Sequence, residues 1–74
     1  MEYNYNKLRG KIKEVFGTQQ EFCKHLQCSE RTLSYKLSNK ICWRQNEILK
    51  TVQLLGLGIE DIPVYFFNYK VQNI

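Results

Sequence analysis

Two helix-starting signals stand close together in the first half of this chain, and they constrain its fold more than any other feature. The first is the capping box Thr18-Gln-Gln-Glu21, in which the threonine hydroxyl and the glutamate carboxylate satisfy each other's free amides. The second is Ser29, a side chain favoured just before a helix. We therefore expect two short helices separated by about three residues. Their inward side chains should be Phe22, Cys23, Leu26, Leu33 and Leu37.

Further helices flank this pair. Gly17 can end an N-terminal helix, and Asn39 can end the helix that follows Ser29, because both residues tolerate a left-handed backbone. Gly56 can close a fourth helix. The apolar side chains at helical spacing are Tyr5, Leu8, Ile12, Val15 and Phe16 in the first helix and Ile48, Leu49, Val52 and Leu55 in the fourth. The segment Ile41-Cys42-Trp43 is predicted to be a buried connecting loop.

The C-terminal part is harder to assign from its pattern. Residues Gly58 to Ile62 can form a short fifth helix, and Pro63 should prevent its regular continuation. The tail, residues 64–74, is aromatic and β-prone, and it can dock over the domain's own core or form a dimer contact. The fold class that we predict is all-α, a compact domain of four to five helices with room for a short C-terminal strand.

Length and composition are those of one domain spanning residues 1–74. The apolar fraction of 43% is ordinary for a globular protein. No segment approaches the ~20 consecutive apolar residues of a membrane-spanning helix. The N-terminus lacks the charged-then-apolar layout of a secretory signal. We therefore expect a soluble, cytoplasmic protein without a membrane partner.

Positive charge is concentrated in one part of the chain. Residues 1–44 hold nine basic and four acidic side chains, a net charge of +5, whereas residues 45–74 hold two basic and three acidic ones, a net charge of −1. Such a field attracts polyanions, although it can also serve only as a solubilising surface. Lys7, Lys11 and Lys13 are expected to form a solvated helix face.

Metal binding and catalysis find little support in the sequence. Three cysteines without a secretory signal indicate reduced thiols rather than a disulfide framework. Cys23, His25, Cys28 and Cys42 could be considered as zinc ligands, but the chain has no Cys-x-x-Cys knuckle. It also lacks a nucleophile elbow and a phosphate-binding glycine loop. We expect no enzyme activity, no metal, no cofactor and no small-molecule ligand.

Two short helices joined by a turn of this length have the geometry of a helix-turn-helix. Residues 18–34 resemble the helix-turn-helix of the phage repressor and Cro family, whose pattern begins Thr-Gln-x-Glu-Leu-Ala and continues Ser-x-x-Thr-Ile-Ser. The whole chain is similar to small Cro-like regulators of phages or prophages of Gram-positive bacteria. They share Lys-Leu-Arg-Gly-Lys-Ile near the start, Lys-Leu before the loop, Trp within it and Ile-Pro-x-Tyr-Phe-Phe near the end. The resemblance covers about residues 3–68, with the helix-turn-helix at about 18–38.

Three positions depart from the family pattern. Gln27 stands where the turn usually has glycine, so either a left-handed backbone there is strained or the turn geometry is slightly shifted. Cys28 replaces the small apolar residue of the turn. Arg44 stands where a Ser or Thr cap would begin the fourth helix, so that cap is weak or the arginine has another role.

In a helix-turn-helix the second helix enters the major groove of DNA. Its outward residues here are Glu30, Arg31, Ser34 and Tyr35, and we predict that they read bases. Arg31 can bind guanine, Glu30 can accept a hydrogen bond from cytosine, and the other two offer hydroxyl or methyl contacts. Glu30 can instead be only a helix N-terminal charge, and Tyr35 can instead cover core surface.

Other polar residues are predicted to position the domain on the DNA backbone. The family resemblance implies phosphate contacts from Thr18 and Gln19 at the start of the first motif helix. Further phosphate contacts are predicted at or after the recognition helix, from Thr32, Lys36, Asn39, Lys40 and Arg44.

The resulting hypothesis is a repressor-like, sequence-specific transcriptional regulator that binds double-stranded operator DNA as a homodimer in the bacterial cytoplasm, at the nucleoid. Dimerisation would also support a domain whose core can supply only about 3–5 kcal/mol. The alternative is a helix-turn-helix protein-interaction module, antirepressor-like, with only non-specific DNA binding. The aromatic side chains Tyr65, Phe66, Phe67 and Tyr69 motivate this alternative.

Overall fold

The computed structural model describes residues 2–69 and confirms the all-α fold class. Two of the helices, α2 and α3, are the capped pair that the sequence predicts. The helices are α1 (Asn6–Phe16), α2 (Gln19–Leu26), α3 (Glu30–Leu37), α4 (Gln45–Leu54), the short 3-10 helix η1 (Ile59–Asp61) and α5 (Ile62–Phe66).

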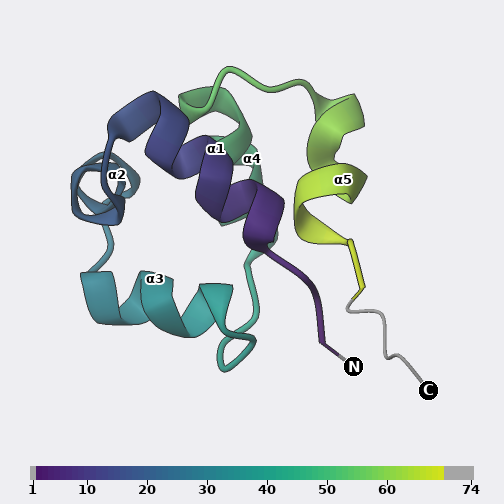
Figure 1. Cartoon of the computed structure of the whole chain (residues 1–74), viewed down its shortest axis with the longest axis horizontal. Coiled ribbons are helices and arrows are strands. Elements are labelled where there is room, and N and C mark those ends of the chain that lie inside the picture. Colours follow the sequence, from purple (N-terminus) through teal and green to yellow (C-terminus); the bar gives the residue numbers. More distant parts are fainter. Residues whose placement is uncertain (1, 70–74) are drawn as a thin grey trace.

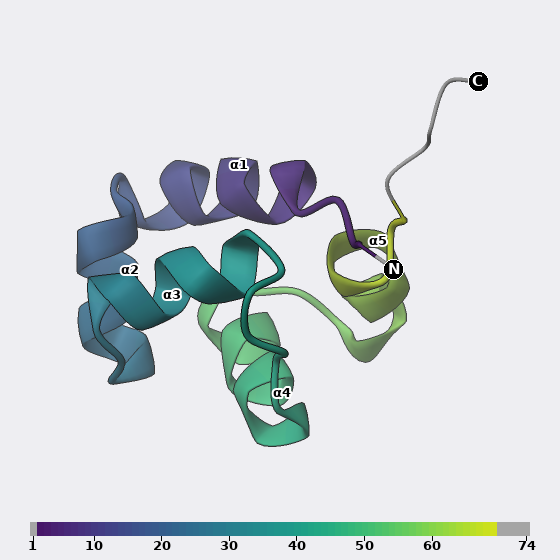
Figure 2. The ribbon, with the colours of Figure 1, turned by 90° about the horizontal axis from the view of Figure 1, so that it is seen from below.

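The α2–α3 pair lies at one end of the molecule and α5 lies at the other, as Figure 1 shows. Helix α1 runs between the two ends, and Figure 2 shows α4 on the side of the molecule opposite α1. One core lies between these helices, with Phe22, Leu8 and Ile12 fully enclosed at its centre. The other buried apolar residues are Tyr5, Cys23, Leu26, Leu33, Leu37, Val52, Leu55 and Phe66.

Helices α2 and α3 begin at the predicted caps. The Thr18 hydroxyl accepts a hydrogen bond from the amide of Glu21 at 3.1 Å, and the Ser29 hydroxyl accepts one from the amide of Thr32 at 3.1 Å. The carboxylate of Glu21 departs from the expected capping box, because it lies 3.4 Å from Lys24 and 3.9 Å from His25. An exposed carboxylate one turn before a lysine and a histidine can contact them instead of its own helix end.

The turn between α2 and α3 is built on a left-handed residue that is not glycine. Gln27 has φ 64° and ψ 46°, and its amide donates to the carbonyl of Cys23 at 2.8 Å. Asn39, after α3, has φ 67°, as its position predicts. The left-handed backbone at Gln27 carries the strain that the missing glycine predicts, since a Cβ atom crowds the following carbonyl there.

Several predicted core positions are exposed instead. Val15 and Leu49 are exposed, because each lies beside the buried stripe of its helix rather than on it. The stripe of α1 is Leu8 and Ile12, preceded by Tyr5. That of α4 is Val52, followed by Leu55. Thr51 takes a fully buried place in α4 that the apolar pattern did not indicate. The loop predicted to be buried is largely open: Ile41 and Cys42 are exposed and Trp43 is half-buried.

The C-terminal part also differs from expectation. Pro63 does not end a helix but stands in the first turn of α5, where its missing N–H costs no hydrogen bond. Helix α5 brings Phe66 into the core, so part of the aromatic tail docks on the domain itself. The expected strand is reduced to one antiparallel bridge between Tyr3 and Tyr69. Residues 70–74 of the predicted tail lie outside the described residues.

Replacing Gln27 with glycine should stabilise the protein. A left-handed backbone costs a residue with a Cβ atom about 1–2 kcal/mol. The greater freedom of glycine in the unfolded chain offsets about 0.5–1 kcal/mol of that gain. We expect Gln27→Gly to raise the free energy of unfolding by up to about 1 kcal/mol in urea titrations. The control Lys24→Gly, in the exposed interior of α2, should lower it by about 1 kcal/mol. A loss of stability in Gln27→Gly would contradict the assigned strain.

Candidate binding surfaces

The solvent side of α3 carries all four residues predicted to read bases. Glu30, Arg31, Ser34 and Tyr35 are exposed, whereas Leu33 and Leu37 of the same helix are buried. The helix therefore presents one cation, one carboxylate and two hydroxyls on a free face. We call this set the α3 face.

Lys40 lies beside the α3 face. Its ammonium group stands 5.2 Å from the centre of the Tyr35 ring, within the range of a cation–π contact. The backbone holds this arrangement, because the amides of Lys40 and Ile41 both donate to the carbonyl of Tyr35, at 2.8 and 3.3 Å. The chain after α3 therefore folds back against Tyr35 and places a cation next to it.

The residues predicted to bind phosphate separate into three groups. Thr18, Gln19, Lys40 and Arg44 have exposed side chains that solvent or a ligand can reach. Thr32 is half-buried, and its hydroxyl accepts a hydrogen bond from the Ser29 hydroxyl at 2.9 Å. That contact belongs to the cap of α3. The remaining two, Lys36 and Asn39, point into the domain.

Lys36 does not present a free cation, contrary to the prediction. Its side chain is only 4% exposed, and its ammonium group pairs with Oε1 of Glu47 at 2.8 Å. The same nitrogen lies 3.4 Å from the carbonyl of Cys42 and 5.8 Å from the ring centre of Trp43. A lysine so enclosed cannot contact a phosphate without leaving its carboxylate partner half-buried and unpaired.

Glu47 is the centre of this buried contact. Its Oε1 also accepts a hydrogen bond from the amide of Arg44 at 2.8 Å, so Glu47 supplies the cap that Arg44 lacks. Burial works against the charged carboxylate, but the hydrogen bonds from Lys36 and Arg44 outweigh it and lower the pKa of Glu47. No sequence pattern pairs Lys36 with Glu47, because only the fold brings α3 and α4 together.

Asn39 is likewise engaged inside the protein. Its side-chain amide donates to the carbonyl of Tyr3 at 2.9 Å and accepts from the amide of Tyr3 at 2.8 Å. Arg9, which sequence reasoning did not select, donates from Nη2 to the carbonyl of Leu37 at 3.0 Å. The motif Lys-Leu-Arg-Gly-Lys-Ile, which contains Arg9, was the available signal.

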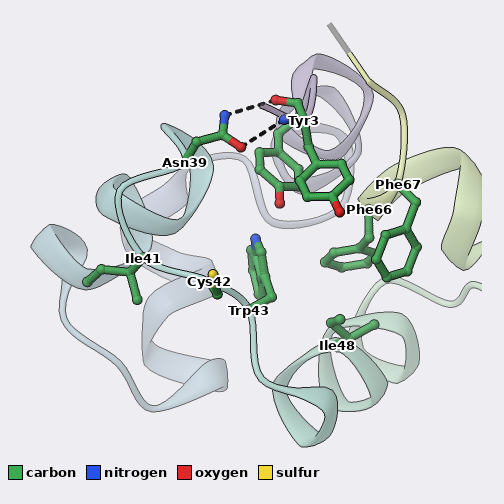
Figure 3. A pocket seen from close by; sticks show the side chains of 9 residues that line it. Tyr3, Asn39, Ile41, Cys42, Trp43, Ile48, Phe66 and Phe67 are labelled. Carbon is green, nitrogen blue, oxygen red and sulfur yellow. Dashed lines mark hydrogen bonds between the residues drawn. The ribbon is translucent and has the colours of Figure 1, made fainter. Parts of the chain in front are cut away.

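An apolar pocket of about 230 Å³ opens where the chain leaves α3. Figure 3 shows Trp43 among its lining side chains, with the Asn39–Tyr3 hydrogen bonds at one side. The indole nitrogen of Trp43 is buried and finds no hydrogen-bond partner among the described residues. The lining residues are Tyr3, Tyr5, Asn39, Ile41, Cys42, Trp43, Ile48, Phe66 and Phe67. We call this set the aromatic pocket.

Aromatic rings contact one another at the edge of the aromatic pocket, where Tyr3 stacks on Tyr69 and meets Phe67 edge-to-face. The ring of Tyr3 lies 5.1 Å from that of Tyr69 and 5.7 Å from that of Phe67, whose side chain is 46% exposed. A side-chain hydrogen bond with Tyr69 raises the pKa of Tyr3. Rings with an apolar body and a polar tip are suited to contact another macromolecule.

The cysteines and the histidine form no metal cluster in residues 2–69. Burial and the neighbouring Cys28 raise the pKa of the Cys23 thiol to about 12, so Cys23 is an inert buried thiol at neutral pH. The ring of His25 packs against that of Phe16 at 5.0 Å. Over the same described range, no helix has the length and apolarity needed to span a membrane.

The chain belongs to the family described as DUF739, "Protein of unknown function", whose model matches residues 1–69. It is also similar to a protein of known structure, the modulator of repression (MOR) of the temperate bacteriophage TP901-1 from Lactococcus lactis. The two chains are 51% identical, the match covers 97% of each, and the TM-score is 0.80. The comparison with curated proteins finds no match.

Removing the Lys36 ammonium group should destabilise the fold. Lys36→Met leaves Glu47 half-buried without its cation, and we expect the free energy of unfolding at pH 7 to fall by about 2 kcal/mol. The double variant Lys36→Met/Glu47→Gln should recover most of this loss, because the amide oxygen still accepts from Arg44. Urea denaturation of the three proteins measures the difference.

The stability difference between the wild type and Lys36→Met should depend on pH. Because the pKa of Glu47 is lowered in the folded state, its contribution is fully present above the unfolded value of about 4.3 and is lost as pH falls through the folded pKa. The difference in the free energy of unfolding between the wild type and Lys36→Met should therefore become smaller in acid. An unchanged gap between pH 7 and about pH 3 would show that the Glu47 charge is not what Lys36 stabilises.

Proposed function

We propose that this chain modulates repression in a temperate phage or prophage, and that it does so by binding rather than catalysis. The 51% identity to a phage modulator of repression, over 97% of both chains, supports this role. Two surfaces are suited to carry it out, the α3 face and the aromatic pocket. Each corresponds to a different mode of regulation.

The first mode is sequence-specific binding of operator DNA, and the exposed α3 face is the observation that carries it. A helix of this kind reads the major groove while the preceding helix crosses the backbone. Arg31 can bind guanine O6 and N7, and Glu30 can accept from the cytosine amine. Ser34 and Tyr35 add hydroxyl contacts or meet a thymine methyl group.

In this mode, contacts to the DNA backbone come from fewer residues than the sequence predicts. Thr18 and Gln19 at the start of α2, with Lys40 and Arg44 beyond α3, are free to meet phosphates. Because a single domain reads only half of a two-fold operator, we propose that two copies bind with their recognition helices about 34–36 Å apart.

The second mode is binding of a protein partner, namely a repressor encoded by the phage or prophage that also encodes this chain. The aromatic pocket favours it, because an apolar cavity with exposed rings at its rim accepts an anchoring side chain from a partner. In this mode the chain would prevent a repressor from binding its operator, and its own DNA binding would be non-specific.

Substitution of Arg31 tests the first mode. The wild type should select preferred duplexes from a randomised DNA pool. Arg31→Ala should weaken binding to the selected duplex by about 1–3 kcal/mol and relax the base preference, as measured by fluorescence anisotropy. Lys40→Ala should weaken binding to all duplexes alike. It should also reduce the slope of the logarithm of affinity against the logarithm of salt concentration by about one unit. Unchanged affinity and base preference in Arg31→Ala would refute the assigned recognition helix.

Substitution of Phe67 tests the second mode. Phe67→Ala removes a ring at the rim of the aromatic pocket and should weaken binding to the phage repressor by about tenfold or more in calorimetric titrations. The control Ile59→Ala removes an apolar side chain that is 72% exposed and does not line the pocket, so it should leave binding unchanged. Equal effects of the two variants would exclude the pocket as the docking site.

A further inference from the structure

The C-terminal end of α3 is held by side chains from segments far away in the sequence. Asn39 bonds to both backbone groups of Tyr3, 36 positions earlier, and so pairs with the N-terminal segment as a neighbouring strand would. Arg9 reaches from α1 to the carbonyl of Leu37, 28 positions later. A guanidinium group at a helix C-terminus satisfies a free carbonyl and opposes the negative end of the helix dipole.

These contacts matter because the backbone packing of α3 is one-sided. Among the described helices, α3 has its most extensive backbone packing with α2, to which the short turn at its N-terminal end joins it. Its C-terminal end lies about 12 Å from that turn, at 1.5 Å per residue. The turn itself therefore leaves the direction of α3 weakly determined. The buried side chains of Leu33 and Leu37 and the Lys36–Glu47 pair hold its inner side. Asn39 and Arg9 hold its far end.

The N-terminal segment that Asn39 binds is itself anchored. Tyr3 forms the antiparallel bridge with Tyr69, and the amide of Asn4 donates to the carbonyl of Asn68. Asn39 thus connects α3 to a pair of extended segments that continues into α5. Because backbone hydrogen bonding joins the two segments, the backbone of Tyr3 that Asn39 binds is held in place.

We infer that Asn39 and Arg9 are positioning residues that set the angle at which the α3 face meets a ligand. The inference rests on the proposed DNA-reading function for its consequence, but the orientation of α3 can be measured without DNA. A tilt of about 10° over a helix of about 12 Å moves its end by about 2 Å. Specific contacts tolerate only about 0.5 Å of displacement.

The variant Asn39→Gly tests this directly. Glycine keeps the left-handed backbone that Asn39 adopts at φ 67° and removes only the amide that binds Tyr3. The control Asn68→Gly removes the same side chain from the exposed segment after α5 and leaves its backbone carbonyl in place. Residual dipolar couplings of the backbone amides give the orientation of α3 relative to α1 in each full-length protein.

We expect α3 to reorient in Asn39→Gly and in Arg9→Met, and to keep its orientation in Asn68→Gly. On the duplex selected by the wild type, the first two variants should lose about tenfold in specific affinity and retain their affinity for a scrambled duplex. Unchanged dipolar couplings in Asn39→Gly would overturn the inference whatever the DNA result. Failure of the wild type to select any duplex, with α3 reoriented in the variant, would instead refute only the proposed DNA reading.

Discussion

The buried pair of Lys36 and Glu47 is the interaction on which the arrangement of α3 and α4 depends. It joins the inner side of α3 to the first turn of α4, and the same carboxylate caps α4 through the amide of Arg44. The ammonium group also lies over the face of Trp43, so the connecting loop is held between the two helices. One carboxylate therefore fixes the start of a helix, a loop and the back of the α3 face.

This use of Lys36 changes the electrostatics of the molecule. A basic first half predicts many free cations, but polar side chains near the end of α3 are engaged inside the domain instead. In a chain of 74 residues the core is small, so hydrogen bonds and ion pairs supply contacts that a larger protein makes with apolar side chains. The four residues predicted to read bases stay exposed on the α3 face. Of the residues predicted to bind phosphate, Lys40, Arg44 and the two at the start of α2 keep exposed side chains.

The aromatic pocket depends on the same region. Its walls come from four parts of the chain, namely the N-terminal segment, the loop after α3, Ile48 of α4, and the end of α5 (Figure 3). Asn39 lines the pocket and also holds the end of α3, so the pocket and the α3 face share a structural element. Under the proposed function, these two neighbouring surfaces would allow one small protein to act on DNA, on a partner protein or on both.

The sequence by itself determined α2 and α3, because caps and left-handed end residues act over three or four positions. Thr18, Ser29 and Asn39 mark helix ends through contacts with their own neighbours, and the exposed positions of α3 follow from helical spacing. Only the tertiary structure decided what Lys36, Asn39 and Arg9 do. Their partners are 11, 36 and 28 positions away, and local patterns carry no information about contacts over such separations.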